Sequence, residues 1–282
     1  MDSALHLSPH HPRSSATPCI GVFDSGVGGL SILRALRRAL PQAPVLYVAD
    51  SGHAPYGERS AAYVIERSRI VATHLIEEGA VGLVVACNTA TAIAVPTLRD
   101  AWRGTPIVGV EPGVKPAAAG TRNGRIGVMA TPATLASERF RQLLRSQAGG
   151  AQVFAQACPG LAALIERGDL DAPDLRFAIE EHTRPLREAA VDTVVLGCTH
   201  YAFVHEPIAA AMGADVQIID TADAVARHAA NTLSRLLPPA GTAAAARLQT
   251  TGSPQALRRF AAAWLPFDCC VEALARGAAV MR

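Results

Sequence analysis

Short apolar runs alternate with longer amphipathic segments from residue 19 onward. The first half of this pattern predicts four strands, at 20–23, 45–49, 81–86 and 107–110. Between them, apolar residues three and four positions apart predict helices that end near Leu40 and Gly79 and begin again at Thr89. Strands that alternate with helices are typical of a parallel sheet in an α/β fold.

The same order begins again after a stretch rich in Pro and Gly at 112–123, which is interpreted as a loop. Strands are predicted at 125–130, 153–157, 192–197 and 216–220, and helices at 134–146, 161–167 and 174–190. Nearer the C-terminus we expect a helix from about Ala222, a linker at 238–241 and a last helix at 256–263. The chain is thus predicted to contain two consecutive α/β units.

The two units are similar to each other. Gly21 precedes Cys87 by 66 residues and Gly127 precedes Cys198 by 71. In each unit the glycine lies in the opening strand and the cysteine follows a strand rich in Val and Leu. We therefore predict two similar parallel-sheet α/β domains related by internal duplication, with the active site in the cleft between them.

Composition narrows the class of protein. Of the 282 residues, 50% are apolar and 18% are charged, which is typical of a globular protein with a substantial core. No apolar run approaches the roughly 20 residues of a membrane helix, and a net charge of +2 with interleaved signs does not favour nucleic-acid binding. Neither a membrane nor a nucleic acid is expected as a partner. Residues 1–18 contain no apolar signal core, so we expect a disordered extension, a cytoplasmic protein and free thiols.

Two kinds of cofactor chemistry are disfavoured by the residue counts. Lys115 is the only lysine, which leaves one candidate in a predicted loop for a pyridoxal phosphate Schiff base. None of the six cysteines forms a C-x-x-C pair, so a structural zinc site is not supported.

Two cysteines directly follow predicted strands. Cys87 precedes Asn88 and Thr89, and Cys198 precedes Thr199 and His200. Parallel α/β sheets bind ligands beyond the carboxyl ends of their strands, where a helix N-terminus lowers the pKa of a thiol. Two thiols on opposite sides of a bound molecule can remove a proton from carbon and return one on the other face. The alternative is that both cysteines are buried and inert, as free cysteines often are.

The glycine turn at 26–29 allows a second interpretation. Together with Asp50 at a later strand end, it is similar to a dinucleotide-binding fingerprint and would indicate a nicotinamide-dependent oxidoreductase. Ser31 stands where that fingerprint has its third glycine, and Asp24 would repel a pyrophosphate. We favour a turn that carries Asp24 and Ser25 into the site, with backbone N–H groups available for a carboxylate.

Four strings in the sequence resemble the glutamate racemases of the aspartate/glutamate racemase superfamily. They are GVFDSGVGGL at 21–30, PYGERS at 55–60, ACNTA at 86–90 and GCTHY at 197–201, with weaker matches at 158–168 and 218–220. The chain departs from the family at Asp50-Ser-Gly-His-Ala, before Pro55, and at Ala202. The resemblance implies a cofactor-independent isomerase that interconverts L- and D-glutamate and supplies D-glutamate for peptidoglycan, and hence for cell wall biogenesis and cell shape.

The resemblance also implies a role for each matching residue. Cys87 would act on the D-enantiomer with Asp24 nearby, and Cys198 on the L-enantiomer with Glu166 and His200 nearby. Substrate contacts would fall on Asp24, Ser25, Tyr56, Gly57, Asn88, Thr89, Thr199 and His200. Each role has a structural alternative; for example, Asp24 could cap the glycine turn and Glu166 could be a solvated helix residue.

In the family the domains are discontinuous, which implies a first domain of 19–112 plus 222–282 and a second of 113–221. Two other functions remain open. A related racemase or isomerase that acts on aspartate, hydantoins or maleate would share the cysteine pair, and a binding protein without activity would share the fold. The partner expected is a small-molecule substrate, glutamate, with a homodimer as one option for assembly.

Overall fold

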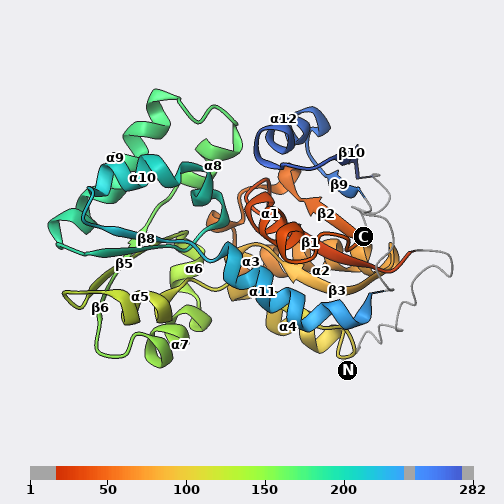
Figure 1. The fold of residues 1–282 in the computed structure, drawn as a ribbon, viewed down its shortest axis with the longest axis horizontal. Coiled ribbons are helices and arrows are strands. Elements are labelled where there is room, and N and C mark those ends of the chain that lie inside the picture. The colour runs from red at the N-terminus through yellow and green to blue at the C-terminus, as the bar shows by residue number, and fades with distance from the viewer. Residues whose placement is uncertain (1–16, 238–244, 275–282) are drawn as a thin grey trace, which may run out of the picture.

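The computed structural model describes residues 17–237 and 245–274. Residues 1–16 of the predicted disordered extension and the predicted linker at 238–241 lie outside the described residues. In the described part, two parallel sheets lie side by side, each covered by helices on both faces (Figure 1). No helix in that part is long and apolar enough to cross a membrane.

The first sheet has six strands in the order β10-β9-β2-β1-β3-β4, and all neighbours are parallel. Its strands are β1 (Cys19–Asp24), β2 (Val45–Ala49), β3 (Ala80–Val85), β4 (Ile107–Gly109), β9 (Ala246–Thr250) and β10 (Cys269–Ala273). In β1, Ile20 and Val22 pack into the core on one face of the sheet and Phe23 into the core on the other. Burial on both faces explains why the central strands are continuous apolar runs.

The second sheet has four parallel strands in the order β6-β5-β7-β8. They are β5 (Arg125–Ala130), β6 (Gln152–Ala157), β7 (Thr193–Leu196) and β8 (Gln217–Ile219). This order repeats β2-β1-β3-β4 strand for strand, so the two units share one topology. The prediction of two similar parallel-sheet α/β units is confirmed.

The helices divide between the faces of the sheets. They are α1 (Leu30–Ala39), α2 (Ala61–Glu77), α3 (Asn88–Ile93), α4 (Val95–Ala101), α5 (Val114–Gly120), α6 (Pro132–Ala136), α7 (Glu138–Gln147), α8 (Leu161–Glu166), α9 (Pro173–Glu188), α10 (His205–Met212), α11 (Ala222–Leu233) and α12 (Pro254–Trp264). On the first sheet, α1, α11 and α12 share one core and α2, α3 and α4 share another. On the second sheet, α8, α9 and α10 pack on one face and α5 and α7 on the other.

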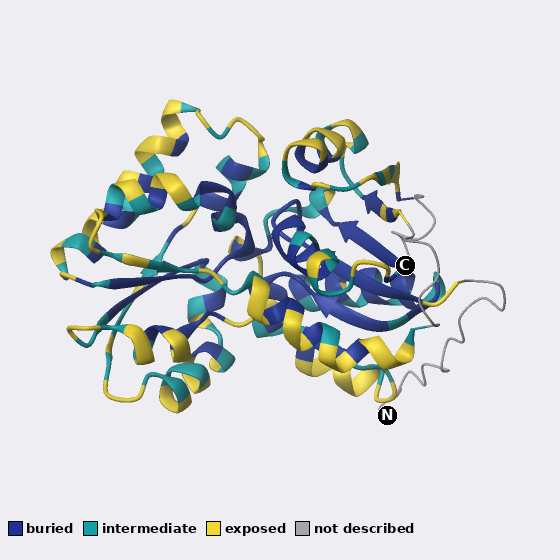
Figure 2. Cartoon of the chain, in the orientation of Figure 1, coloured by how far each residue is buried: buried dark blue, intermediate teal, exposed yellow. Residues whose placement is uncertain are grey.

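The core on the α1 side continues from one sheet to the other. Phe203 lies in a 3-10 helix after β7 (η3, Thr199–Val204), and its ring centroid is 4.6 Å from that of Trp264 and 5.5 Å from that of Phe260, both on α12. Figure 2 shows the central strands of the sheets buried, while the outer faces of the helices are exposed. The residues at the carboxyl ends of β1 and β7 come close together, since Asp24 Oδ2 lies 4.0 Å from His200 Nδ1.

Several elements differ from the predictions. The helix predicted at 134–146 is two helices, α6 and α7, which meet at Ser137. Strands β9 and β10 and helix α10 were not predicted, and the predicted loop at 112–123 contains α5. Lys115 therefore lies in a helix and not in a loop. Pro116 fits there because it lies in the first turn, where backbone N–H groups have no partner within the helix. The predicted domain division at 112/113 and 221/222 stays a prediction.

Candidate active site

Cys87 lies between β3 and α3 and is 5% exposed. Its Sγ accepts a hydrogen bond from the N–H of Ala90 (3.5 Å), and its thiol donates to Ser25 Oγ (3.7 Å). Burial and then the charge of Asp24 raise the pKa of the thiol well above its ordinary value, although the Ala90 N–H acts in the opposite direction. The helix N-terminus therefore acts in the expected direction, but desolvation outweighs its one backbone N–H and the net pKa is raised.

Asp24 ends β1 and is fully buried. Its Oδ2 accepts a hydrogen bond from the N–H of Gly29 (2.7 Å), and its Oδ1 accepts one from Ser25 Oγ (3.4 Å). Burial raises the pKa of its carboxyl group, while His200 and Cys87 act to lower it. Asp24 therefore caps the glycine turn and is also part of the polar cluster that contains Cys87.

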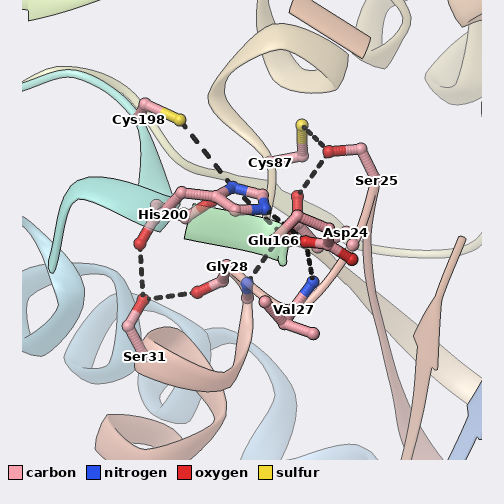
Figure 3. Close-up of polar contacts among 12 residues, drawn as sticks. Asp24, Ser25, Val27, Gly28, Ser31, Cys87, Glu166, Cys198 and His200 are labelled. Carbon is pink, nitrogen blue, oxygen red and sulfur yellow. Dashed lines mark hydrogen bonds and ion pairs between the residues drawn. The ribbon is translucent and has the colours of Figure 1, made fainter. Parts of the chain in front are cut away.

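Cys198 follows β7 and is 7% exposed. Its Sγ lies 3.9 Å from His200 Nδ1, and His200 Nε2 lies 2.8 Å from Glu166 Oε2. Figure 3 shows these three side chains in a row, with Cys87 beside Ser25 across the site. Cys198 is close enough to Cys87 for its charge to contribute to the pKa of that thiol. The structure thus brings both cysteines to one place.

His200 is buried and faces a thiol and two carboxyl groups. Burial alone would lower its pKa, but the contacts with Cys198, Glu166 and Asp24 outweigh burial and raise the pKa well above its ordinary value. Cys198 therefore has an imidazole as its polar neighbour. The two cysteines therefore have different electrostatic surroundings, since a carboxyl group lies beside Cys87.

Glu166, the last residue of α8, is tied to the glycine turn of the first unit and is not a solvated helix residue. Its Oε2 accepts from the N–H of Val27 (2.9 Å) and its Oε1 from Ser51 Oγ (2.7 Å). A Cβ on Gly26 would lie 2.3 Å from Glu166 Oε2, and one on Gly28 would lie 2.4 Å from His200 Nδ1. The glycines are needed because the turn packs directly on these side chains.

This packing corrects one expectation about the turn. Its N–H groups were expected to be available for a substrate carboxylate, but two of them are used within the protein: the N–H of Val27 donates to Glu166 and that of Gly29 to Asp24. The turn therefore binds two carboxyl groups of the protein itself.

The other residues predicted to contact substrate have partners within the protein. Thr89 Oγ1 lies 2.9 Å from Thr131 Oγ1 and 3.2 Å from Thr134 Oγ1, which link the first unit to the second. Asn88 Nδ2 donates to the carbonyl of Val110 (3.4 Å). The backbone carbonyl of Thr199 accepts from Ser31 Oγ (3.5 Å). Each of these hydrogen bonds would compete with one to a bound molecule.

The turn at 55–57 is held by a buried carboxylate that sequence reasoning did not assign to the site. The hydroxyl of Tyr56 donates to Asp50 Oδ2 (2.5 Å), and Arg67 donates to both oxygens of Asp50 (2.9 and 3.0 Å). Thr251 donates to Asp50 Oδ1 as well (2.9 Å). Gly57 packs against Thr131, since a Cβ on this glycine would lie 2.5 Å from Thr131 Cγ2.

These contacts argue against the nicotinamide interpretation. An acidic residue that binds a ribose hydroxyl must present a free carboxylate at the strand end. Asp50 is fully buried, and its two oxygens bind Arg67, Tyr56 and Thr251.

Within the described residues, no group of three or more His, Cys, Asp or Glu side chains could hold a metal ion.

Comparison with known proteins gives consistent matches. The model of the Asp/Glu/Hydantoin racemase family matches residues 28–229. A glutamate racemase from Pseudomonas aeruginosa is 51% identical over 241 residues, which are 85% of this chain and 91% of the relative.

Two solved structures have the same fold. The glutamate racemase of Escherichia coli, in complex with L-glutamate and the activator UDP-MurNAc-ala, is 32% identical with a TM-score of 0.81 and covers 92% of this chain and 98% of its own. The glutamate racemase of Francisella tularensis, in complex with D-glutamate, is 27% identical with a TM-score of 0.78 and covers 92% and 97%. On this evidence the chain belongs to the Asp/Glu/Hydantoin racemase family, and its relatives there are glutamate racemases.

Proposed function

We propose that this protein interconverts L- and D-glutamate by proton transfer between Cα and two cysteine thiols, with no cofactor. The observation that carries the proposal is the pair of buried thiols, Cys87 and Cys198, which follow equivalent strands and meet at one polar cluster. Relatives that bind L-glutamate in one case and D-glutamate in the other support glutamate as the substrate. The product D-glutamate would supply peptidoglycan synthesis.

Each thiol would serve one face of the substrate. In the L-to-D direction the Cys198 thiolate takes the Cα proton of L-glutamate, and the electron pair of the broken C–H bond is delocalised into the α-carboxylate. The Cys87 thiol then donates its proton to the opposite face, which forms D-glutamate and leaves Cys87 as the thiolate. The reverse direction exchanges the roles of the two thiols. A thiol suits both steps, because its ordinary pKa is within reach of neutral pH.

The neighbours of each thiol would assist its step. His200, held by Glu166 at 2.8 Å, would face Cys198 while that sulfur exchanges the proton. Asp24 and Ser25 lie on the Cys87 side, where the carboxyl group disfavours a thiolate and so favours a thiol that is ready to donate. Asp24 would therefore assist proton transfer at Cys87, and Glu166, through His200, would assist it at Cys198.

Substrate binding is proposed at residues that already carry polar groups around the thiols. These are Asp24, Ser25, Tyr56, Gly57, Asn88, Thr89, Thr199 and His200. The Tyr56 hydroxyl is bonded to Asp50, so the contact at 56–57 would fall to the backbone. Thr89 would exchange its hydrogen bonds to Thr131 and Thr134 for one to the substrate.

Domain organisation and setting complete the proposal. The first domain would comprise 19–112 plus 222–282 and the second 113–221, a division supported by the separate strand sets of the two sheets. A cytoplasmic location would give the free thiols that the mechanism needs. A homodimer is proposed as one option for assembly, and sedimentation of the purified protein would decide between monomer and dimer.

Circular dichroism of L- and D-glutamate in D₂O, without added cofactor, tests the function. Wild type is expected to remove the optical activity of either enantiomer and to place deuterium at Cα. Cys87→Ser and Cys198→Ser should abolish racemisation, each leaving at most hydrogen exchange on the enantiomer that the remaining thiol serves. Cys270→Ser, at an exposed cysteine of β10, is the matched control and should behave as wild type.

Two results would contradict the proposal. A folded wild type that racemises aspartate but not glutamate would point to a related racemase. A folded wild type that acts on neither acid would indicate a binding protein.

A further inference from the structure

The two thiols differ in where their supporting groups come from. Ser25, Ala90 and Asp24, which surround Cys87, all belong to the part of the chain that builds the first sheet. Cys198 contacts His200 and, through it, Glu166, both in the part that builds the second sheet. Glu166 links the group around Cys198 to the first unit, because it accepts hydrogen bonds from Val27 and Ser51.

Both oxygens of Glu166 are held from across the site. Oε1 accepts from Ser51 Oγ (2.7 Å), and Oε2 accepts from the N–H of Val27 (2.9 Å) as well as facing His200 Nε2 (2.8 Å). Ser51 begins a short 3-10 helix after β2 (Ser51–His53), directly after the buried Asp50. Asp50 is fixed by Arg67, so Ser51 stands on a rigid part of the first unit.

The loss of these bonds would act first on the Cys198 side, because Glu166 contacts His200 directly. A Glu166 side chain without its bond to Ser51 has one oxygen free to rotate away, and the orientation of the His200 ring depends on the other oxygen. Bonds to a charged acceptor are among the stronger hydrogen bonds in proteins. No bond of Cys87, Ser25 or Asp24 involves Ser51 or Glu166 among the hydrogen bonds of the described residues.

We propose that Ser51 is a positioning residue for Cys198: with the N–H of Val27, it holds Glu166 against His200, so that the proton-transfer group of Cys198 is complete only when the two units are in contact. The proposal rests on the proposed racemase function. It makes the hydrogen-bonded group of Cys198 dependent on contact between the units, whereas the hydrogen bonds of Cys87 come from the first unit.

A racemase requires a particular test for such a one-sided effect. The two enantiomers have equal free energies, so kcat/KM must fall equally in both directions whichever thiol is impaired. The primary kinetic isotope effects measured in the two directions, by contrast, need not be equal. Deuterium at Cα is removed by Cys198 from one enantiomer and by Cys87 from the other, and slowing one transfer makes that step more rate-limiting.

The experiment compares Ser51→Ala with wild type, using L- and D-glutamate with hydrogen or deuterium at Cα. We expect kcat/KM to fall roughly tenfold in both directions, the effect of one hydrogen bond to a charged group. The isotope effect on kcat/KM should rise for the enantiomer that Cys198 serves, L-glutamate in the proposed assignment, and fall for the other. Exchange by the single-cysteine variants identifies that enantiomer independently.

Two variants serve as matched controls. Ser51→Thr keeps the hydroxyl and should restore both the rate and the isotope effects. Ser25→Ala removes the hydroxyl 3.7 Å from Cys87 and should raise the isotope effect for the opposite enantiomer. If Ser51→Ala melts well below wild type, Ser51→Cys, which has nearly the same shape and a weaker donor, takes its place.

The results distinguish failure of the role of Ser51 from failure of the proposed racemase function. An unchanged rate, equal changes in the two isotope effects, or a rise for the enantiomer that Cys87 serves would overturn the role of Ser51 while the racemase function stands. A wild type that does not racemise glutamate would instead overturn the proposed function.

Discussion

Cys87 and Cys198 occupy the same place in two copies of one topology, each the second residue after the third strand of its unit, β3 or β7. Their neighbours are nevertheless different. The thiol of Cys87 lies 3.7 Å from Ser25 Oγ with Asp24 beside it, whereas Sγ of Cys198 lies 3.9 Å from an imidazole nitrogen of His200. A duplicated framework thus presents two thiols to one site in different polar surroundings, a hydroxyl and a carboxyl group for Cys87 and an imidazole for Cys198.

Asp24→Asn is expected to lower the pKa of the Cys87 thiol. Burial is the largest cause of its raised pKa, and the Asp24 charge comes next, so removal of the charge removes the second cause. The rate of alkylation of Cys87 by iodoacetamide, followed by peptide mass spectrometry, should rise at lower pH than in wild type. Cys158 is an internal control, because burial mainly raises its pKa to about 12 and Asp24 is not among the causes. An unshifted pH profile for Cys87 would show that the Asp24 carboxyl is uncharged throughout.

His200→Gln should make stability less dependent on pH. The pKa of His200 in the folded protein lies well above its ordinary value of 6.5, despite burial, because of Cys198, Glu166 and Asp24. Its contribution to the free energy of unfolding is therefore fully present below the unfolded pKa and is lost as pH rises through the folded value. Urea unfolding should show a difference between wild type and variant that is larger near pH 6.5 than in the alkaline range. A difference that grows with pH would mean that His200 is neutral in the folded protein.

Much of the fold could be predicted from the sequence, because its central strands are buried on both faces. The predicted strands at 45–49 and 125–130 coincide with β2 and β5, which are apolar runs between turn residues. Strand β9 reads Ala-Arg-Leu-Gln-Thr and β10 reads Cys-Cys-Val-Glu-Ala. These strands lie toward the sheet edge. β9 pairs with β2 and β10 pairs with β9, and no local pattern reveals these pairings.

The residues of the site also differ in whether local sequence predicts their position. Cys87, Asp24, Cys198 and His200 belong to short local motifs, so their place at strand ends could be expected from the sequence. The bond from Ser51 to Glu166 joins residues 115 positions apart, and it depends on how the two units pack. The only sequence signal for Ser51 was its place in the segment that departs from the family, where a changed residue invites a look at what it contacts.

Arg67→Met is expected to destabilise the protein by about 3–5 kcal/mol, because it leaves the fully buried Asp50 carboxylate without its charged partner. Chemical unfolding of the variant measures this loss directly. The double variant Asp50→Asn with Arg67→Met removes both charges and should recover part of the stability. Equal destabilisation by the single and double variants would mean that packing of the Arg67 side chain, and not its charge, is what matters.

Gly28→Ala should impair catalysis more than folding, because a Cβ at this position meets groups of the opposite unit. It would lie 2.4 Å from His200 Nδ1 and 2.7 Å from Thr199 Oγ1, closer than side chains normally approach. To relieve this contact the His200 ring must move, and with it the group that faces Cys198 (Figure 3). We expect racemisation to fall at least about tenfold, while overpacking lowers the free energy of unfolding by about 1–3 kcal/mol. Gly104→Ala is the matched control, since a Cβ there has no neighbour within 4 Å, and it should retain wild-type activity and stability. Full activity in Gly28→Ala would show that the two units need not pack at this glycine for His200 to act on Cys198.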